Sequence, residues 1–204
     1  MAGQGIFGRR GLIYRHMYLG EMVGSGTQVF DNIVSRKITA KEIAGFDNII
    51  SGVDWGWYPD PWVFIRTYYH AGTRTLYIFD EARGNKLTNH VTAKIVKERV
   101  APGELILADL SDEKACADYR SFGLRCWPAR KGPGSRELGV KWLQGLTAIV
   151  IDPNRCPCTL QEFLEWEYEV APDGTVLGTL MDARDHGIDA ARYACSRIWQ
   201  RKGA

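Results

Sequence analysis

The chain has 204 residues, a length that favours one large domain with an appended arm over two full domains. Hydrophobic residues make up 45% of the sequence and charged residues 25%, which excludes disordered, collagen-like and coiled-coil chains. The 26 basic and 24 acidic residues give a net charge of +2, so a nucleic-acid surface would have to come from clustered charge.

No apolar run approaches the ~18 consecutive residues that a membrane span needs. The basic start of the chain is not followed by the apolar segment of a secretory signal, so we expect a cytoplasmic protein without membrane association. The five cysteines include no CxxC pair, which favours reduced thiols. Cys156 and Cys158 resemble half of a zinc site, but no second pair has matching spacing, and a structural zinc is not expected.

After an arm over residues 1–46, the predicted elements alternate in the manner of an α/β domain. A buried strand starts at Ile49 and ends in a loop after Asp54. Two strands joined by Ala-Gly-Thr follow, and then helices and strands in turn: strands 62–70 and 74–82, helix 88–100, strand 104–111, helix 112–123, strand 124–130, helix 135–146, strand 147–153 and helix 159–167. A Pro-Asp-Gly turn then indicates a hairpin or an ordered loop over 168–180, before a closing amphipathic helix over 185–202. This order predicts a mixed sheet flanked by helices in a domain spanning 47–204.

Three acids stand in apolar surroundings, where an unpaired carboxylate is costly. Asp54 follows one buried strand, Asp109 ends another, and Asp189 lies in the apolar part of the last helix. A strand-end aspartate often caps the next helix, which remains an alternative for Asp109. Because strand ends on one sheet edge converge, and a helix packed there can add a third acid, we predict a site for two Mg²⁺ or Mn²⁺ ions. Two such ions, about 3.5–4 Å apart, can activate water and stabilise the leaving oxygen in phosphodiester cleavage.

The start of the last helix adds a histidine to these acids. His186 and Asp189 are three residues apart and therefore lie on one face of the helix. The alternative is purely structural, with Asp185 as the N-cap and His186 exposed in the first turn. In that case Asp189 would pair with Arg192 or Lys202.

Further residues near the predicted site leave two interpretations open. Arg130, Lys131 and Arg136 surround two glycines and a proline around the start of helix 135–146, and they form either a clamp for DNA phosphates or a solvated surface loop. Glu81 is either a fourth acid at the metal edge or, as we favour, an ordinary surface residue at a strand end.

Four aromatic residues follow the first acid: Trp55, Trp57, Tyr58 and Trp62. Stacking on an unwound base is one possible use of such side chains. We favour packing in the hydrophobic core, because tryptophan is largely buried in most proteins.

Four segments follow one another along the chain: GVDWG, LILADLSDEK, ARKGPGS and DHGIDAARYA. In this order and spacing they resemble the nuclease domain of the large terminase subunit of tailed phages, the headful-packaging type also found in prophages. The resemblance runs from about residue 30 to the end, and its last segment is the most specific. It implies a ribonuclease H-like fold and a two-metal endonuclease that cuts concatemeric viral DNA during genome packaging. Asp54 and Asp109 match the family's two strand acids, and in the last helix Asp189 matches its acid and His186 the preceding histidine.

The resemblance also implies partners and a setting. The substrate is double-stranded DNA in the bacterial host cytoplasm, and the protein partners are the packaging ATPase part, the portal and the small terminase subunit. Residues 15–34 resemble the segment that joins the ATPase to the nuclease. Because the sequence contains no GxxxxGK[ST] phosphate loop, it resembles the nuclease half only, and we expect it neither to hydrolyse ATP nor to move DNA by itself.

Other functions share parts of this pattern. A junction resolvase or an exonuclease with the same fold would use similar carboxylates, and a DNA-docking module would keep the fold without useful metal affinity. The GVDWG segment also resembles the first phosphate loop of actin-like and sugar-kinase ATPases. That fold needs two lobes and a second glycine-rich hairpin, for which this chain has neither the room nor the residues.

Overall fold

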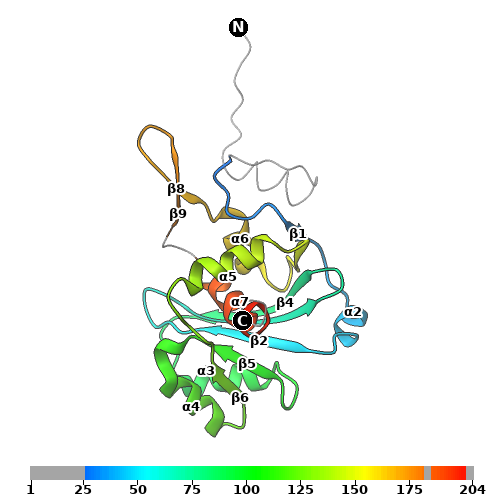
Figure 1. The fold of residues 1–204 in the computed structure, drawn as a ribbon. Helices are drawn as coiled ribbons and strands as arrows, with labels where there is room; N and C mark the ends of the chain where they lie inside the picture. The colour runs from blue at the N-terminus through cyan, green and yellow to red at the C-terminus, as the bar shows by residue number, and fades with distance from the viewer. Residues whose placement is uncertain (1–25, 182–184, 201–204) are drawn as a thin grey trace.

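A computed structural model describes residues 26–181 and 185–200, and its centre is a seven-stranded sheet in the order β1-β7-β4-β3-β2-β5-β6 (Figure 1). The strands are β1 (Ile33–Ser35), β2 (Ile49–Asp54), β3 (Trp62–His70), β4 (Thr75–Gly84), β5 (Leu105–Ala108), β6 (Arg125–Pro128) and β7 (Ala148–Ile151). All neighbouring strands are parallel except β3, which is antiparallel to both β2 and β4. The predicted mixed sheet is confirmed, and the carboxyl ends of β2 and β5 lie side by side at one edge.

Helices cover both faces of the sheet (Figure 1). One face is covered by α3 (Asn89–Lys97) and α4 (Glu113–Ser121), the other by α5 (Ser135–Gln144), α6 (Pro157–Glu165) and α7 (His186–Ala194). Side chains alternate between these layers along β3: Val63 and Ile65 pack with α5, α6 and α7, whereas Phe64 packs with α3 and α4. The sheet is packed between these two hydrophobic layers, which fix the position of the carboxyl ends of its strands, here called the carboxyl edge.

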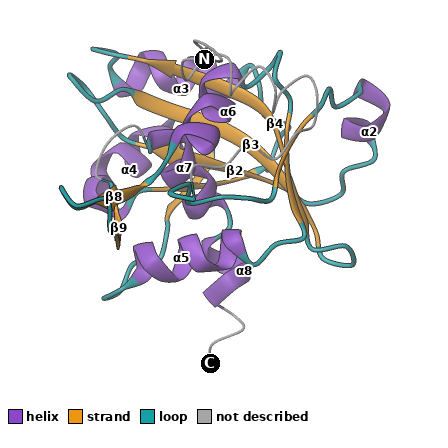
Figure 2. Cartoon of the chain, turned by 90° about the horizontal axis from the view of Figure 1, so that it is seen from above, coloured by secondary structure: helices purple, strands orange, loops and turns teal. Residues whose placement is uncertain are grey.

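Helix α7 lies across β2 and β3 (Figure 2). It approaches β2 closely at Gly52, where an added Cβ would lie 1.8 Å from the carbonyl oxygen of Ala190. Glycine is therefore required at this crossing, because any side chain would push the helix off the sheet. Ile188 and Ala191 bury the same face of α7 in the core. This packing sets the start of α7 beside the end of β2.

The observed elements differ from the predicted ranges mainly at their ends. The closing helix is split into α7 and α8 (Ser196–Trp199), with Cys195 between them. Helix α6 begins at Pro157, because proline is well tolerated in the first turn of a helix. The hairpin over 168–180 is confirmed as β8 (Tyr168–Val170) and β9 (Val176–Leu180), which extend away from the sheet (Figure 1).

Part of the predicted arm joins the sheet. Strand β1 pairs in parallel with β7, and the short helix α2 (Ala40–Ala44) follows it. Phe30 and Ile33 are buried in the core with α5 and α6. Residues 1–25, which include most of the 15–34 segment, lie outside the described residues. Within the described ranges, no helix is long and apolar enough to cross a membrane.

Candidate functional site

The end of β2 and the residue after β5 lie next to each other at the carboxyl edge of the sheet. Asp54 is the last residue of β2, and its side chain is buried. Asp109 follows β5 directly and donates its backbone N–H to the carbonyl oxygen of Val53 at 3.0 Å. Helix α7 brings Asp189 close enough that its charge, together with that of Asp109, raises the pKa of Asp54. The three predicted acids therefore share one electrostatic environment.

Asp54 is the most deeply buried of these acids and is bound to the predicted histidine. The Nδ1 atom of His186 lies 2.9 Å from Oδ2 of Asp54. Burial raises the pKa of Asp54 to about 6, and repulsion from Asp189 and Asp109 adds to this increase, while the hydrogen bond with His186 opposes it. The same hydrogen bond raises the pKa of His186 despite its partial burial. His186 is therefore part of the site and is not an isolated surface side chain.

Asp109 combines a capping role with an ion pair. It is the N-cap of a short 3-10 helix, η2 (Leu110–Asp112), and accepts hydrogen bonds from the backbone N–H and the hydroxyl of Ser111 at 3.2 and 2.7 Å. Its carboxylate also pairs with the ammonium group of Lys131. Burial alone would raise the pKa of Asp109, but Lys131 and Ser111 together lower it. The capping alternative for Asp109 is thus confirmed, alongside its position at the predicted site.

Asp189 is held by the next turn of its own helix. Arg192 donates from Nε and Nη2 to the two carboxylate oxygens of Asp189 at 3.1 and 2.8 Å, and the Tyr193 hydroxyl donates at 3.3 Å. This is the Arg192 pairing of the structural alternative, while Lys202 lies outside the described residues. Asp109 and Asp189 thus each pair with a cationic side chain, which offsets part of the cost of burying their charge, whereas Asp54 is hydrogen-bonded to a histidine.

The first turn of α7 is fixed by a residue that the sequence patterns did not reveal. Asp185 occupies the N-cap position, but its side chain makes no capping hydrogen bond and pairs instead with Arg136. Glu162 of α6 accepts the N–H of Gly187 at 2.6 Å and a hydrogen bond from Arg83 at 2.7 Å. The available sign was the helical spacing, which places Glu162 on the same face of α6 as the buried residues Thr159 and Phe163.

Glu81 has a structural role that neither interpretation anticipated. It accepts hydrogen bonds from the backbone N–H groups of Cys158 and Thr159 at 3.0 and 2.9 Å and from the Thr159 hydroxyl at 2.6 Å. A carboxylate at this point satisfies the free N–H groups at the start of α6 and interacts favourably with the helix dipole. The expectation of an exposed strand-end residue is therefore wrong, because the side chain of Glu81 is only 7% exposed.

The basic loop and the first turn of α5, which holds Arg136, lie against the site, and their three cations differ in their contacts. Lys131 reaches Asp109, and its Nζ lies 5.1 Å from the ring centroid of Tyr193. Arg136 pairs with Asp185, next to His186 in the chain. Arg130 is exposed, and its carbonyl oxygen accepts a hydrogen bond from Gln200 at 2.9 Å. Two of the three predicted DNA-binding residues therefore contact acids at or next to the site.

The chemistry of the site fits a divalent cation. Carboxylate oxygens are the preferred ligands of Mg²⁺ and Mn²⁺, and imidazole is accepted by Mn²⁺. Burial raises the pKa of Asp54 most, and the repulsion from Asp189 and Asp109 that adds to this increase is the kind that a bound cation relieves. Among the described residues, no group of three or more His, Cys, Asp or Glu side chains is arranged to hold a metal ion. In this arrangement Lys131 faces Asp109 and Arg192 faces Asp189, so cations of the chain neutralise two of the acids.

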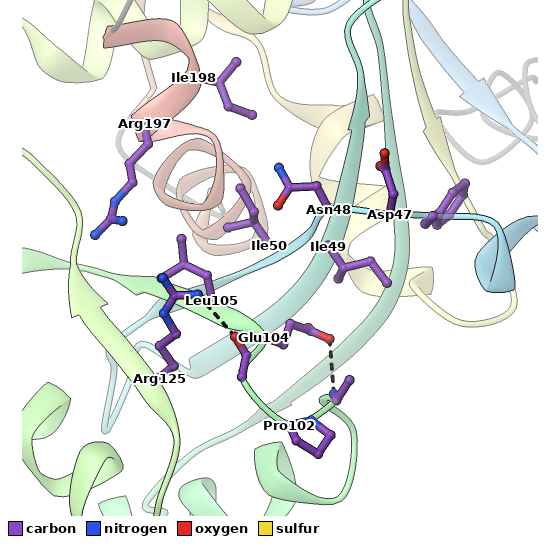
Figure 3. A pocket seen from close by; sticks show the side chains of 13 residues that line it. Asp47, Asn48, Ile49, Ile50, Pro102, Glu104, Leu105, Arg125, Arg197 and Ile198 are labelled. Carbon is purple, nitrogen blue, oxygen red and sulfur yellow. Dashed lines mark hydrogen bonds between the residues drawn. The ribbon is translucent and has the colours of Figure 1, made fainter.

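A cavity of about 670 Å³ lies at the other end of the strands, lined by the residues before and at the start of β2 and β5 (Figure 3). The residues that line it include Asp47, Arg125 and Arg197. Glu104 at this cavity is bound to Arg66 by two hydrogen bonds of 3.0 and 2.7 Å. The cavity is therefore separate from the acids at the carboxyl edge.

Comparison with known proteins places the part of the chain that carries the site in one protein family. The model of the family described as "Terminase RNAseH like domain" matches residues 54–197, a range that contains Asp54, Asp109, His186 and Asp189. The large terminase subunit of Bacillus phage SPP1 is 39% identical over 199 residues, covering 96% of this chain and 47% of that protein. The PBSX phage terminase large subunit of Bacillus subtilis strain 168 is 28% identical over 144 residues, covering 71% and 33%. The chain thus spans less than half the length of these relatives.

Solved structures agree with this assignment. The nuclease domain of the large terminase from bacteriophage SPP1, solved with bound Mn, is 37% identical with a TM-score of 0.77, covering 82% of this chain and 97% of that one. The P22 large terminase nuclease domain shares the fold at 17% identity, with a TM-score of 0.61 over 83% and 91% of the two chains. The α/β sheet with its helices is therefore ribonuclease H-like, as predicted. The chain belongs to the terminase RNase H-like domain family.

Proposed function

We propose that this protein is the nuclease part of a phage large terminase, an endonuclease that cuts concatemeric viral DNA during genome packaging in the bacterial host cytoplasm. The observation that carries this proposal is the meeting of Asp54, Asp109, Asp189 and His186 at one edge of the sheet. The SPP1 relative, with bound Mn, and the chain's family membership support it. Double-stranded DNA is the proposed substrate, and the ATPase part, the portal and the small terminase subunit are the proposed partners.

In this proposal Asp54, Asp109 and Asp189 hold two Mg²⁺ or Mn²⁺ ions, and His186 orients Asp54 for this role. Such ions supply an activated water and stabilise the charge that develops on the leaving oxygen. Asp109 and Asp189 now pair with Lys131 and Arg192, and binding metal instead would leave the Lys131 ammonium available to a DNA phosphate. His186 keeps the Asp54 carboxylate oriented through Nδ1 and holds a proton at the site, since its pKa is raised.

The basic loop supplies the proposed contacts to the DNA backbone. Arg130 is exposed and free to reach a phosphate, and Lys131 and Arg136 lie at the rim of the site. Contacts of this kind position DNA without reading its sequence. Little sequence preference is therefore expected for binding.

The protein is expected to nick and linearise supercoiled plasmid in Mn²⁺ or Mg²⁺ and to leave it intact in excess chelator. Phosphate contacts should dominate binding, so DNA affinity should fall steeply as salt rises, by about 10³-fold or more between 50 and 200 mM salt if six or more phosphates are contacted. Gel electrophoresis of the plasmid measures cleavage, and anisotropy of a labelled duplex measures binding. Cleavage that survives chelation contradicts the proposal, and cleavage confined to four-way junctions or to DNA ends would favour a resolvase or an exonuclease. Binding without any cleavage would favour a docking module.

Replacing His186 with alanine is expected to lower cleavage about 10- to 100-fold, to the same extent in Mn²⁺ and in Mg²⁺. The physical reason is that Nδ1 of His186 is bound to Asp54, so the ring orients a metal-ligating carboxylate. His70→Ala is the matched control, because His70 is exposed at the far end of β3, where its ring is hydrogen-bonded to Thr73 of the adjoining turn. A larger loss in Mn²⁺ would instead indicate direct ligation by the imidazole, which suits manganese better than magnesium.

A further inference from the structure

The loop between β2 and β3, residues 55–61, is here called the aromatic loop. The core takes up two of the four aromatic side chains in and next to it: Trp62 is 2% exposed, and Trp55 packs edge-on against Tyr119 at a centroid distance of 5.0 Å. Trp57 and Tyr58, in contrast, are 55% and 66% exposed. The prediction that these aromatics pack in the core is therefore wrong for Trp57 and Tyr58.

The aromatic loop is held in one conformation by hydrogen bonds from the end of β4. Lys86 donates its backbone N–H to the carbonyl oxygen of Trp57 at 2.8 Å, and Asn85 donates to that of Pro59 at 3.0 Å. Gly56 lies so close to Pro61 that an added Cβ would be 2.3 Å from the proline carbonyl oxygen. The exposed rings thus stand on an ordered base, and a ligand that binds them pays little for ordering the loop.

A cation stands next to the exposed rings. The ammonium group of Lys86 lies 4.6 Å from the ring centroid of Tyr58. The backbone of Lys86 is in the left-handed region, with a φ of 56°, an uncommon conformation that the loop contacts maintain. An aromatic face beside a positive charge matches a nucleotide, which offers the flat face of a base and a negative phosphate.

The aromatic loop touches the proposed catalytic site. Asp60 of the loop lies 3.5 Å from Nε2 of His186, whose Nδ1 is bound to Asp54. Trp55 donates its indole N–H to the carbonyl oxygen of Asp109 at 3.1 Å. Trp57 and Tyr58 stand between these two contact residues in the chain, so DNA with a phosphate at the acids would lie next to the aromatic loop.

We propose that Trp57 and Tyr58 bind the face of an unpaired base next to the phosphate that is cut, with Lys86 on the adjoining backbone phosphate. This inference rests on the proposed function, because it takes DNA as the substrate. Inside a duplex both faces of a base are covered by its neighbours, so the occupant is a base that has left the stack. Each stacked base contributes about five- to hundredfold to affinity, which makes the effect measurable.

The test is a binding measurement without metal. Fluorescence anisotropy in chelator compares three labelled DNAs of one length: a fully paired duplex, a duplex with a central unpaired bubble, and the same bubble with abasic sites. The parent protein should prefer the bubble over both others by about five- to hundredfold. The double variant Trp57→Ala/Tyr58→Ala should lose that preference and bind the three DNAs alike. Because both side chains are exposed, its melting temperature should equal that of the parent.

The matched control is Trp127→Ala on the edge strand β6. Trp127 is 45% exposed, and the Arg120 guanidinium carbon lies 4.9 Å from the centre of its ring. It therefore offers an exposed aromatic ring beside a cation, as Tyr58 does, but outside the aromatic loop. This variant should keep the preference of the parent. The proposal is overturned if the parent binds paired and bubble DNA equally, if abasic sites make no difference, or if Trp127→Ala loses as much as the double variant.

Plasmid cleavage in Mn²⁺ separates the two proposals. A parent protein that cleaves plasmid but shows no preference for unpaired bases refutes the stacking role alone. A parent protein that prefers unpaired bases but does not cleave in metal refutes the nuclease role and leaves the stacking site standing.

Discussion

Replacing Asp54 with asparagine is expected to reduce plasmid cleavage about a thousandfold or more, because it removes a charge that stabilises the metal ions by several kcal/mol. Asp54 is the acid at which the other site residues meet: His186 binds it, and Asp109 and Asp189 act on its pKa. Comparable losses of cleavage are expected for Asp109→Asn and Asp189→Asn. Gel assays of nicking at saturating Mn²⁺ measure the effect.

The same Asp54→Asn variant is expected to be more stable than the parent in metal-free buffer at pH 8. The pKa of Asp54 is raised from 3.8 to about 6 in the folded protein. Between pH 3.8 and pH 6, the Asp54 carboxyl is ionised in the unfolded chain but still protonated in the folded protein. The free energy of unfolding therefore falls as the pH rises through this range, and the full cost of ionising buried Asp54 is present above pH 6. That cost is about 1–3 kcal/mol, and asparagine avoids it while still offering an oxygen to His186.

Thermal melts in chelator at pH 5 and pH 8 check this expectation. The gain in melting temperature of Asp54→Asn over the parent should be larger at pH 8 than at pH 5. Asp60→Asn is the matched control, because Asp60 faces the same histidine but its side chain is 72% exposed, so its removal should change stability little. A variant that melts well below the parent at pH 8 would mean that Asp54 is a structural anchor of the sheet edge.

Replacing Glu162 with alanine is expected to cost about 3–5 kcal/mol of stability, the range for breaking a buried ion pair on one side. Glu162 is 9% exposed in its side chain and binds both the guanidinium of Arg83 and the N–H of Gly187. Without Glu162, the remaining carboxylate partner of Arg83 is Glu81, at the longer distance of 3.9 Å, and the Gly187 N–H loses its buried acceptor. For a domain of this size the melting temperature should fall by about 6–20 °C.

Two neighbouring variants give this prediction its controls. Gln161→Ala removes an exposed side chain from the same turn of α6, so its melting temperature should stay close to that of the parent. Glu162→Gln keeps an acceptor for Gly187 but removes the charge that faces Arg83, so its loss should be intermediate. If Glu162→Ala melts like Gln161→Ala, the ion pair contributes nothing to the start of α7. A loss as large in Glu162→Gln as in Glu162→Ala would assign the whole effect to the charge.

Much of the architecture could be predicted from the sequence, because it depends on local patterns. The apolar runs before Asp54 and Asp109 predict two buried strands, and parallel neighbours end at the same edge, so the two acids had to come close. The three-residue spacing of His186 and Asp189 placed them on one face of α7. These inferences require only the period of a strand, the period of a helix and the direction of the chain.

The partners of these acids were decided by the tertiary structure alone. Lys131 pairs with Asp109, 22 positions earlier in the sequence. The N–H of Gly187 in the first turn of α7 is bound by Glu162, whereas the local pattern had favoured Asp185 as the capping residue. Likewise, Trp57 and Trp62 stand five positions apart with similar surroundings in sequence, yet one is exposed and the other buried. Such outcomes depend on how closely helices approach the sheet, as α7 does at Gly52, and on which side chains then compete for the remaining space. Local propensity cannot predict which side chains become buried, because that depends on contacts that form only when the helices pack on the sheet.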